Sequence, residues 1–259
     1  MKTACLLLAV VLSAAACKAE SPYRPLSWSD GSILAGAAVI GGIASVLDRR
    51  IEPFTPTEIA SLSKESVNMF DRPATAFFSE TSQKLSDWGL CTALALPVFL
   101  AFDNKSVRDG SKFAAMYAQT LFTVGAITEL TKVTVKRVRP YAYAADPTRA
   151  EQLPRDARKS FFSGHTSAAF AAAVFAAKVF EDYNPDSGLK PIVWGGTLTL
   201  ASAVGVWRVT AGKHFPSDVL VAAVVGSAVG YAIPSIHKKS APPVAIGSSP
   251  QLITFYVSF

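Results

Sequence analysis

Three blocks of the sequence combine cations, histidines and a carboxylate at short spacing. In chain order they are Lys132-x6-Arg139-Pro140, Ser163-Gly164-His165 and Arg208-x5-His214-x3-Asp218. Three fixed cations could neutralise the equatorial oxygens of a phosphoryl group in transfer. Two histidines could divide the roles of nucleophile and general acid, and a carboxylate could orient one of them. These residue types therefore predict phosphate-ester chemistry that needs no metal.

The first two blocks are expected at helix ends. Lys132 and Arg139 are seven residues apart, about two helical turns, so both should project from one helix face. Pro140 disfavours helical geometry at the residue before it, which predicts that the helix ends at Arg139. Ser163 stands in the N-cap position of an alanine-rich helix, and the amides from Gly164 onward form an anion site. The pair of cations would thus reach toward an anion at the mouth of a helix bundle.

The third block is the most specific. His214 and Asp218 are four residues apart, so the carboxylate can hold one ring nitrogen and leave the other free to attack. Arg208 closes the preceding helix, and a short turn would bring it back toward His214. Taken singly, each block has a structural alternative: a cationic helix end, a capped helix or a polar connector. Glu129 is expected to form an ion pair with Lys132.

The elements that must position these blocks are helices. Six apolar stretches have helical period and cover residues 33–47, 88–102, 113–130, 167–180, 192–207 and 219–236. A mostly helical polar region, 56–87, is expected to pack over the bundle, with a lid over the site as the alternative. A long loop, 141–160, joins two blocks, and the alternation in 251–259 predicts a strand. We therefore expect an all-α bundle of about six core helices, with the active site at helix ends and a short strand-like C-terminal tail.

Composition restricts the partners. The chain has 259 residues, half of them hydrophobic, with a net charge of +6, and its mean hydropathy is +0.31. The charge suits an anionic substrate or an anionic membrane surface, whereas nothing resembles the basic, aromatic-rich helix of a nucleic-acid-binding protein. Three cysteines do not predict a disulfide framework, and Cys91 fits a small core residue. His237 is expected to belong to a solvated basic end with its neighbours Lys238 and Lys239. Neither a metal site nor an oligomeric state is indicated.

The N-terminus is typical of an export signal. Lys2 precedes an apolar stretch over residues 4–16 that ends in three alanines. Cys17 follows them and could be lipidated, as in a bacterial lipoprotein, although Ala14 stands where such signals usually have Leu. These features predict a bacterial cell-envelope protein, either periplasmic or membrane-associated. The expected division is a signal over 1–17, a linker over 18–31, a helical phosphatase domain over 32–237 with its motif core at 113–236, and a tail over 238–259.

The order and spacing of the three blocks resemble the signature of the type 2 phosphatidic acid phosphatase and vanadium haloperoxidase superfamily. Two positions depart from it, because Phe162 stands where the family usually has Pro and Trp207 where it usually has Ser. The resemblance implies that His214 is the nucleophile and forms a phosphohistidine, that Asp218 orients it, and that His165 is the general acid. It also implies a group of phosphoryl-binding residues: Lys132, Arg139, Ser163, Gly164 and Arg208.

The expected function is hydrolysis of phosphomonoesters or diphosphates, of a lipid or of a small soluble ester, without a metal or cofactor. One alternative is a haloperoxidase in which vanadate occupies the phosphate site. Another is a non-catalytic envelope protein that binds lipids or anions. Most apolar stretches have fourteen to eighteen residues, fewer than the roughly 20 that cross a bilayer. Two membrane arrangements stay open, a periplasmic helical domain tied to the membrane and a multi-span protein, and we expect membrane association in both.

Overall fold

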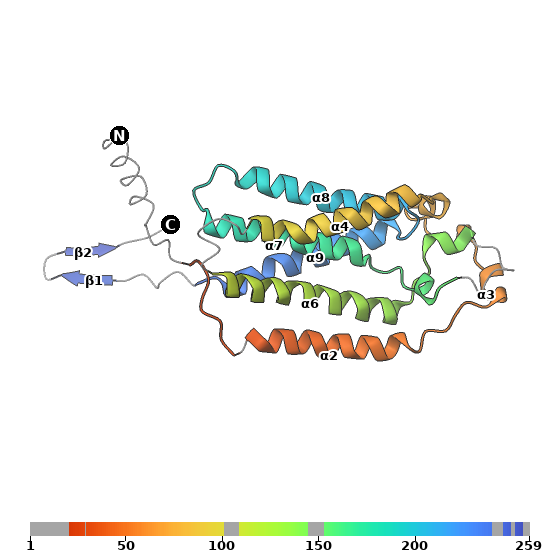
Figure 1. Cartoon of the computed structure of the whole chain (residues 1–259), viewed down its shortest axis with the longest axis horizontal. Coiled ribbons are helices and arrows are strands. Elements are labelled where there is room, and N and C mark those ends of the chain that lie inside the picture. The colour runs from red at the N-terminus through yellow and green to blue at the C-terminus, as the bar shows by residue number, and fades with distance from the viewer. Residues whose placement is uncertain are drawn as a thin grey trace, which may run out of the picture.

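The computed structural model describes residues 21–28, 30–100, 109–144, 153–239, 246–249 and 252–255. Six long helices lie side by side along one axis (Figure 1). They are α2 (Asp30–Asp48), α4 (Glu80–Leu100), α6 (Gly110–Val135), α7 (Gly164–Tyr183), α8 (Lys190–Thr210) and α9 (Pro216–His237). The predicted all-α bundle of six core helices is confirmed.

Short elements join the long helices at one end of the bundle. They are α3 (Pro56–Ala60) and the 3₁₀ turns Lys64–Ser66, Arg72–Ala76, Pro140–Ala144 and Arg155–Arg158. A capping box starts α3, because Thr55 accepts a hydrogen bond from the amide of Glu58 and the glutamate accepts one in return. The region before α4 packs against the bundle, as predicted, since Asp71 bonds to the first turn of α9.

The central helix is α7, which contacts α4, α6, α8 and α9. Its buried face consists largely of alanines, so neighbouring helices approach closely. Gly226 and Gly230 of α9 are the extreme case. A Cβ at these positions would lie 2.2 Å from the carbonyl oxygen of Ser167 and 2.4 Å from that of Ala171. Small side chains therefore set the spacing between α7 and α9.

The observed helices are longer than the apolar stretches that predicted them. Their end turns are polar, as at Glu80 in α4 and Lys132 in α6, and hydrophobic period alone does not reach them. The inference that the helices are too short for a bilayer is wrong for three of them. In the described part of the chain, α2, α8 and α9, with 19, 21 and 22 residues, are long and apolar enough to cross a membrane.

The end of α6 also differs from the prediction. The helix stops at Val135, not at Arg139, because Lys136 adopts a left-handed conformation with φ of 51° and its amide bonds to the carbonyl of Lys132. Arg139 consequently lies on the segment after the helix, just before Pro140. The two predicted phosphate-binding cations do not share a helix face.

Two short strands pair near the C-terminus. Strands β1 (Ile246–Ser249) and β2 (Leu252–Phe255) pair antiparallel, with Ile246 opposite Phe255. The second strand lies within the predicted segment 251–259, whereas β1 has no alternating pattern to predict it. The predicted signal and Cys17 lie outside the described residues, as do residues 145–152 of the predicted long loop.

Candidate active site

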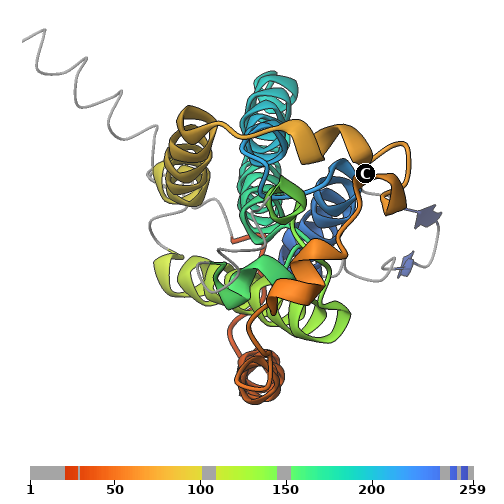
Figure 2. The same ribbon diagram turned by 90° about the vertical axis from the view of Figure 1, so that its right-hand side faces the viewer.

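The three sequence blocks meet at one end of the bundle, the end that faces the viewer in Figure 2. The first block spans the last turn of α6 and the segment after it, the second begins α7, and the third joins α8 to α9. Contacts of Arg139 with Lys213 and His214, and of His214 with Ser160, connect these segments directly. The residues predicted from separate blocks therefore belong to one site.

The turn between α8 and α9 reverses the chain within a few residues. The amides of Lys213 and His214 both donate to the carbonyl of Arg208, at 3.1 and 3.3 Å. Gly212 permits this turn with a positive φ of 69°, and a Cβ there would lie 2.2 Å from the carbonyl oxygen of Phe77. The turn places the ring of His214 beside the end of α8.

His214 is buried, with 1% of its surface exposed. Its Nδ1 lies 2.7 Å from the carbonyl oxygen of Ser160, which can only accept a hydrogen bond, so Nδ1 carries the proton. Nε2 lies 3.4 Å from Arg139 Nη1 and is the unprotonated nitrogen. Burial, with the charges of Arg139 and Arg208 and against the opposing charge of Asp218, holds the pKa of His214 well below its usual value. The ring is thus neutral, and its Nε2 lone pair lies beside a cation.

Asp218 contacts this ring less directly than its spacing predicts. Its Oδ2 is 3.7 Å from His214 Nδ1, because the carbonyl of Ser160 already accepts the ring proton. The same carboxylate oxygen accepts hydrogen bonds from Ser160 Oγ at 2.5 Å and from the amide of Phe215 at 2.9 Å. Asp218 therefore positions Ser160, whose carbonyl accepts the hydrogen bond from the ring of His214.

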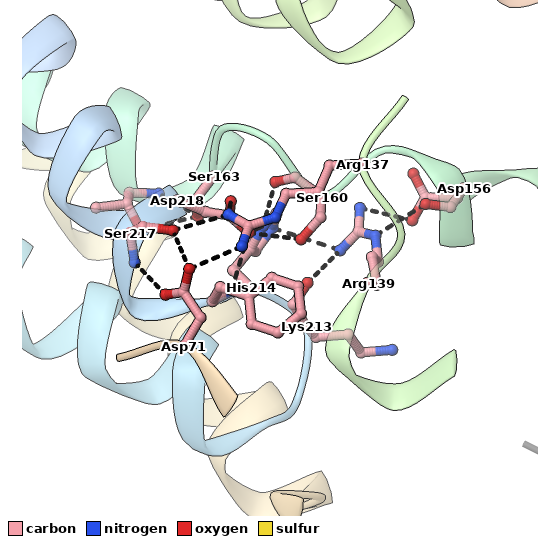
Figure 3. Close-up of polar contacts among 12 residues, drawn as sticks. Asp71, Arg137, Arg139, Asp156, Ser160, Ser163, Lys213, His214, Ser217 and Asp218 are labelled. Atoms are coloured by element: carbon pink, nitrogen blue, oxygen red, sulfur yellow. Dashed lines mark hydrogen bonds and ion pairs between the residues drawn. The ribbon is translucent and has the colours of Figure 1, made fainter. Parts of the chain in front are cut away.

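Behind Asp218 lies a second layer of contacts (Figure 3). Arg137 bridges two buried carboxylates, with Nη1 2.5 Å from Asp218 Oδ1 and Nη2 2.7 Å from Asp71 Oδ2. Asp71 also accepts from the amide and the hydroxyl of Ser217, at 2.9 and 2.6 Å. The segment before α4 is in this way fastened to the start of α9 and to the catalytic candidates.

Lys132 extends toward the start of α7. Its Nζ would lie 3.1 Å from a Cβ on Gly164, so the glycine lets the ammonium group approach the backbone. The same atom forms the predicted ion pair with Glu129 at 2.9 Å. The ammonium and the first amides of α7 consequently lie side by side.

Arg139 is held in an extended arrangement by three contacts. Its Nε donates to the carbonyl of Asp156 at 2.9 Å, its Nη2 pairs with the carboxylate of the same residue at 2.7 Å, and its Nη1 donates to the carbonyl of Lys213 at 3.2 Å. These contacts fix the guanidinium next to His214 Nε2.

Arg208 and His165 share a carboxylate. Arg208 Nη1 donates to Ser86 Oγ at 3.2 Å and lies 3.8 Å from Asp87 Oδ1, which is 2.9 Å from His165 Nε2. Within the described residues, the buried Nε of Arg208 has no hydrogen-bond partner. Burial and the charge of Arg208 lower the pKa of His165 to about 4, although Asp87 acts in the opposite direction.

Ser163 caps α7, as its position predicts. Its side chain accepts hydrogen bonds from the amide and the hydroxyl of Thr166, at 3.4 and 2.9 Å. Because Ser163 is the acceptor in both bonds, its own hydrogen stays available for a further acceptor such as a phosphoryl oxygen.

Three half-exposed carboxylates surround the cations. Asp87, Glu129 and Asp156 have side chains that are 52, 49 and 51% exposed, and each pairs with one of the predicted phosphate-binding or acid residues. A half-exposed carboxylate can turn to water at small cost, so an incoming phosphoryl group could replace it on the cations.

Sequence reasoning missed four residues of this site: Ser160, Arg137, Asp71 and Asp87. Arg137 lies inside the first block, and its position there was a usable signal. Asp71 lies in the segment before α4, Asp87 in the first turns of α4, and Ser160 in the loop before α7. No local sequence pattern distinguishes these three residues from surface residues. In the described residues, no cluster of three or more His, Cys, Asp or Glu could hold a metal.

Fold and site together define a helical-bundle protein in which a buried, neutral histidine lies among cations at helix ends. The chain belongs to the PAP2 superfamily, whose model matches residues 113–242. The matched region contains all three blocks.

Two curated proteins and one solved structure are similar to this chain. A PA-phosphatase related-family protein of Dictyostelium discoideum is 33% identical over 152 residues, 53% of this chain and 55% of that protein. Phospholipid phosphatase 1 of Rattus norvegicus is 28% identical over 125 residues, 40% of this chain and 44% of that protein. The chain thus matches about half the length of these curated relatives or less.

The similar solved structure is that of a transmembrane PAP2-type phosphatidylglycerolphosphate phosphatase from Bacillus subtilis. It covers 77% of this chain and 94% of its own, with a TM-score of 0.50 and 20% identity. At this level of identity the likeness supports the fold.

Proposed function

We propose that this protein is a metal-independent phosphatase that hydrolyses phosphomonoesters or diphosphates of a membrane lipid. The observation that carries the proposal is the buried, unprotonated Nε2 of His214 beside Arg139. A neutral histidine is a nucleophile, and fixed guanidinium groups stabilise the charge that develops on phosphoryl oxygens. The Nε of Arg208, which has no partner in the described part of the chain, adds a donor that an anion would satisfy.

In the first step, His214 Nε2 forms a bond to phosphorus and the bond from phosphorus to the ester oxygen breaks. The leaving oxygen takes a proton from His165. Lys132, Arg139 and Arg208, with the Ser163 hydroxyl and the Gly164 amide, hold the three remaining oxygens. The product of this step is a phosphohistidine, and the Ser160 carbonyl supports it by accepting the Nδ1 proton throughout.

In the second step, water attacks the phosphorus of the phosphohistidine and His165 takes the proton that the water loses. The phosphorus–nitrogen bond breaks, inorganic phosphate leaves, and His214 returns to the neutral form. His165 thus acts first as an acid and then as a base. No step needs a metal ion or a cofactor.

A lipid substrate agrees with three features. Helices α2, α8 and α9 are long and apolar enough to cross a membrane. The site lies at the end of the bundle, where the headgroup of a lipid would lie if these helices span the bilayer. The names of the rat and Bacillus relatives also refer to phospholipid and phosphatidylglycerolphosphate substrates.

The test is phosphate release by the full-length protein in detergent, with a chelator present. Substrates are phosphatidate, phosphatidylglycerol phosphate, undecaprenyl diphosphate and p-nitrophenyl phosphate. We expect release from at least one lipid, inhibition by vanadate as a phosphate mimic, and loss of release in His214→Ala. Binding of these lipids without turnover would contradict the proposal, and so would halide oxidation that requires vanadate.

A further inference from the structure

A long apolar groove runs between α2 and α6, away from the cluster of phosphate-binding residues. Its volume is about 800 Å³, and its walls include Ala38 and Gly41 of α2 and Phe122 and Gly125 of α6. Its wall on this side extends from Ala37 of α2 to Arg49, the residue after the helix, about 18 Å along the helix axis at 1.5 Å per residue. The groove exists because α2 packs mainly on α6 and stands apart from the other helices (Figure 2).

The groove leads to the active site at its polar end. Glu129 lines the groove and also forms the 2.9 Å ion pair with Lys132. The Lys132 ammonium in turn lies against Gly164 at the start of α7. One turn of α6 therefore separates the apolar channel from the proposed phosphoryl site, and a single molecule could occupy both.

We propose that this groove binds an acyl chain of the phosphorylated lipid while its phosphate is held by Lys132. This inference rests on the proposed function. It assigns recognition of the acyl chain to a surface that lies outside the three sequence blocks. In a membrane, the chain would enter sideways from the bilayer. The groove would then align the chain so that the phosphate arrives beside the cations, where Lys132 exchanges Glu129 for the phosphoryl oxygen.

The dimensions favour a hydrocarbon chain over a helix of this or another protein. Over about 18 Å, the volume corresponds to an open groove with a mean width of about 7 to 8 Å. A helix with its side chains is about 10 to 12 Å across, which is wider than this groove. An extended chain advances about 1.2 Å per bond, so the groove accommodates about 15 carbons. The small residues of the walls leave this width open.

Two glycines allow the groove to be filled without disturbing the fold. A Cβ at Gly41 or at Gly125 would meet no atom within 4 Å, so leucine can replace either residue and project into the channel. Gly42 is the matched control. It is equally open but lines a separate depression with Ile43 and Val46, and Gly42→Leu adds the same bulk to the same helix.

The experiment compares KM and kcat for dipalmitoyl phosphatidate, dibutyryl phosphatidate and p-nitrophenyl phosphate in detergent micelles. We expect Gly41→Leu and Gly125→Leu to raise KM for the dipalmitoyl lipid about tenfold, as the loss of about 1.4 kcal/mol of contacts would do. The values for the other two substrates should stay within about twofold, which also shows that the variants are folded. Gly42→Leu should behave as the unmodified protein with all three.

Three results would overturn the inference. One is an unchanged KM for the dipalmitoyl lipid in both groove variants. Another is an equal increase in Gly42→Leu, which would assign the effect to bulk on α2 alone. The third is a change of oligomeric size in the groove variants with KM unchanged, which would make the groove a protein-docking surface. Failure of the unmodified protein to release phosphate from any of these substrates would instead contradict the proposed function itself.

Discussion

The two ends of the bundle each bury a histidine near a carboxylate, and the two rings have different neighbours. His214 at the active-site end and His237 at the opposite end both have Nδ1 close to a backbone carbonyl, of Ser160 at 2.7 Å and of Ile233 at 2.9 Å. They differ at Nε2. That of His214 lies beside the guanidinium of Arg139, whereas that of His237 lies 3.2 Å from Asp30 Oδ1 and, among the described residues, makes no hydrogen bond.

The surroundings of the two rings differ in the same way. At the opposite end, the buried Asp182 is shared by Lys178, Lys238 and the hydroxyl of Tyr23. Asp182 thus has three partners and little exposure to water. Its contacts connect Tyr23, before α2, to the ends of α7 and α9. At the active-site end, the carboxylates that pair with Lys132, Arg139 and Arg208 are half exposed and replaceable. We infer that replaceable partners, more than buried charge as such, distinguish the proposed anion site from the opposite end.

The largest expected difference between the ends is in catalysis. His214→Ala should lower phosphate release at least about 10³-fold, because it removes the attacking atom. His237→Ala should lower the melting temperature, since it leaves Asp30 with fewer partners, and should keep turnover per folded molecule within about twofold. Phosphate-release kinetics and thermal unfolding in detergent measure both. Undiminished phosphate release by His214→Ala would contradict the role of His214 as the attacking residue.

A second comparison concerns arginines that pair with buried carboxylates, Arg137 with two and Arg24 with one. Arg137→Ala leaves two buried carboxylates without a cation, and we expect it to lower the free energy of unfolding by about 3 to 5 kcal/mol. Arg24→Ala should cost about 1 kcal/mol, because Arg24 is partly exposed and Asp30 keeps its bonds from Ser27. Denaturant unfolding monitored by tryptophan fluorescence gives both values. Equal losses would show that Arg137 is an ordinary surface cation.

Substitutions at two glycines are expected to distinguish an effect on turnover from an effect on helix packing. Gly164→Ala places a methyl group against the mobile end of Lys132, so turnover should fall about tenfold while stability changes little. Gly230→Ala directs a methyl group at the carbonyl of Ala171, which should lower the free energy of unfolding by about 1 to 3 kcal/mol without a matching loss of kcat. Kinetics and unfolding on both variants check this prediction, and a reversed pattern would contradict it.

The smallest expected difference between variants is in the pH profile. With a pKa of about 4 in the free protein, His165 is unprotonated near pH 7 and must gain its proton as substrate binds. Since the acid form is required, kcat/KM should fall as pH rises above this pKa. The profile of kcat should stay flat to higher pH, because a bound phosphate raises the pKa of the ring.

Asp87→Asn sharpens this prediction. Asp87 raises the pKa of His165, so its removal should move the falling limb of the kcat profile to lower pH by about one unit. Asp156→Asn is the control, because Asp156 pairs with Arg139 and not with His165. An identical shift in both variants would mean that general loss of negative charge, not the contact of Asp87 with the ring, moves the limb.

The sequence was sufficient for the six helices and for the blocks that meet at one end, because hydrophobic period and short-range spacing are local properties. It was insufficient where the determining contact is distant in the chain. His237 was expected in a solvated end, yet it is buried, and Asp30 from the start of α2, far away in the chain, lies against it. Asp71 and Asp87 belong to the site for the same reason.

Local conformation produced the other differences. The early end of α6 depends on the left-handed Lys136, a conformation that a lysine rarely adopts and that no residue type there predicts. The Ser160 carbonyl, which fixes the tautomer of His214, is a backbone atom and carries no sequence signature at all. Blocks of side chains were thus predictable, whereas the atoms that set their protonation were not.

The proposed mechanism requires His214 Nε2 to become bonded to phosphorus. Rapid mixing of the full-length protein with ³²P-labelled lipid phosphate, an alkaline quench that preserves phosphohistidine, and peptide mapping test it directly. We predict labelled protein during turnover, with the label on the peptide that contains His214, and no label in His214→Ala. Continued phosphate release with no labelled protein, or a label on another residue, would contradict the account.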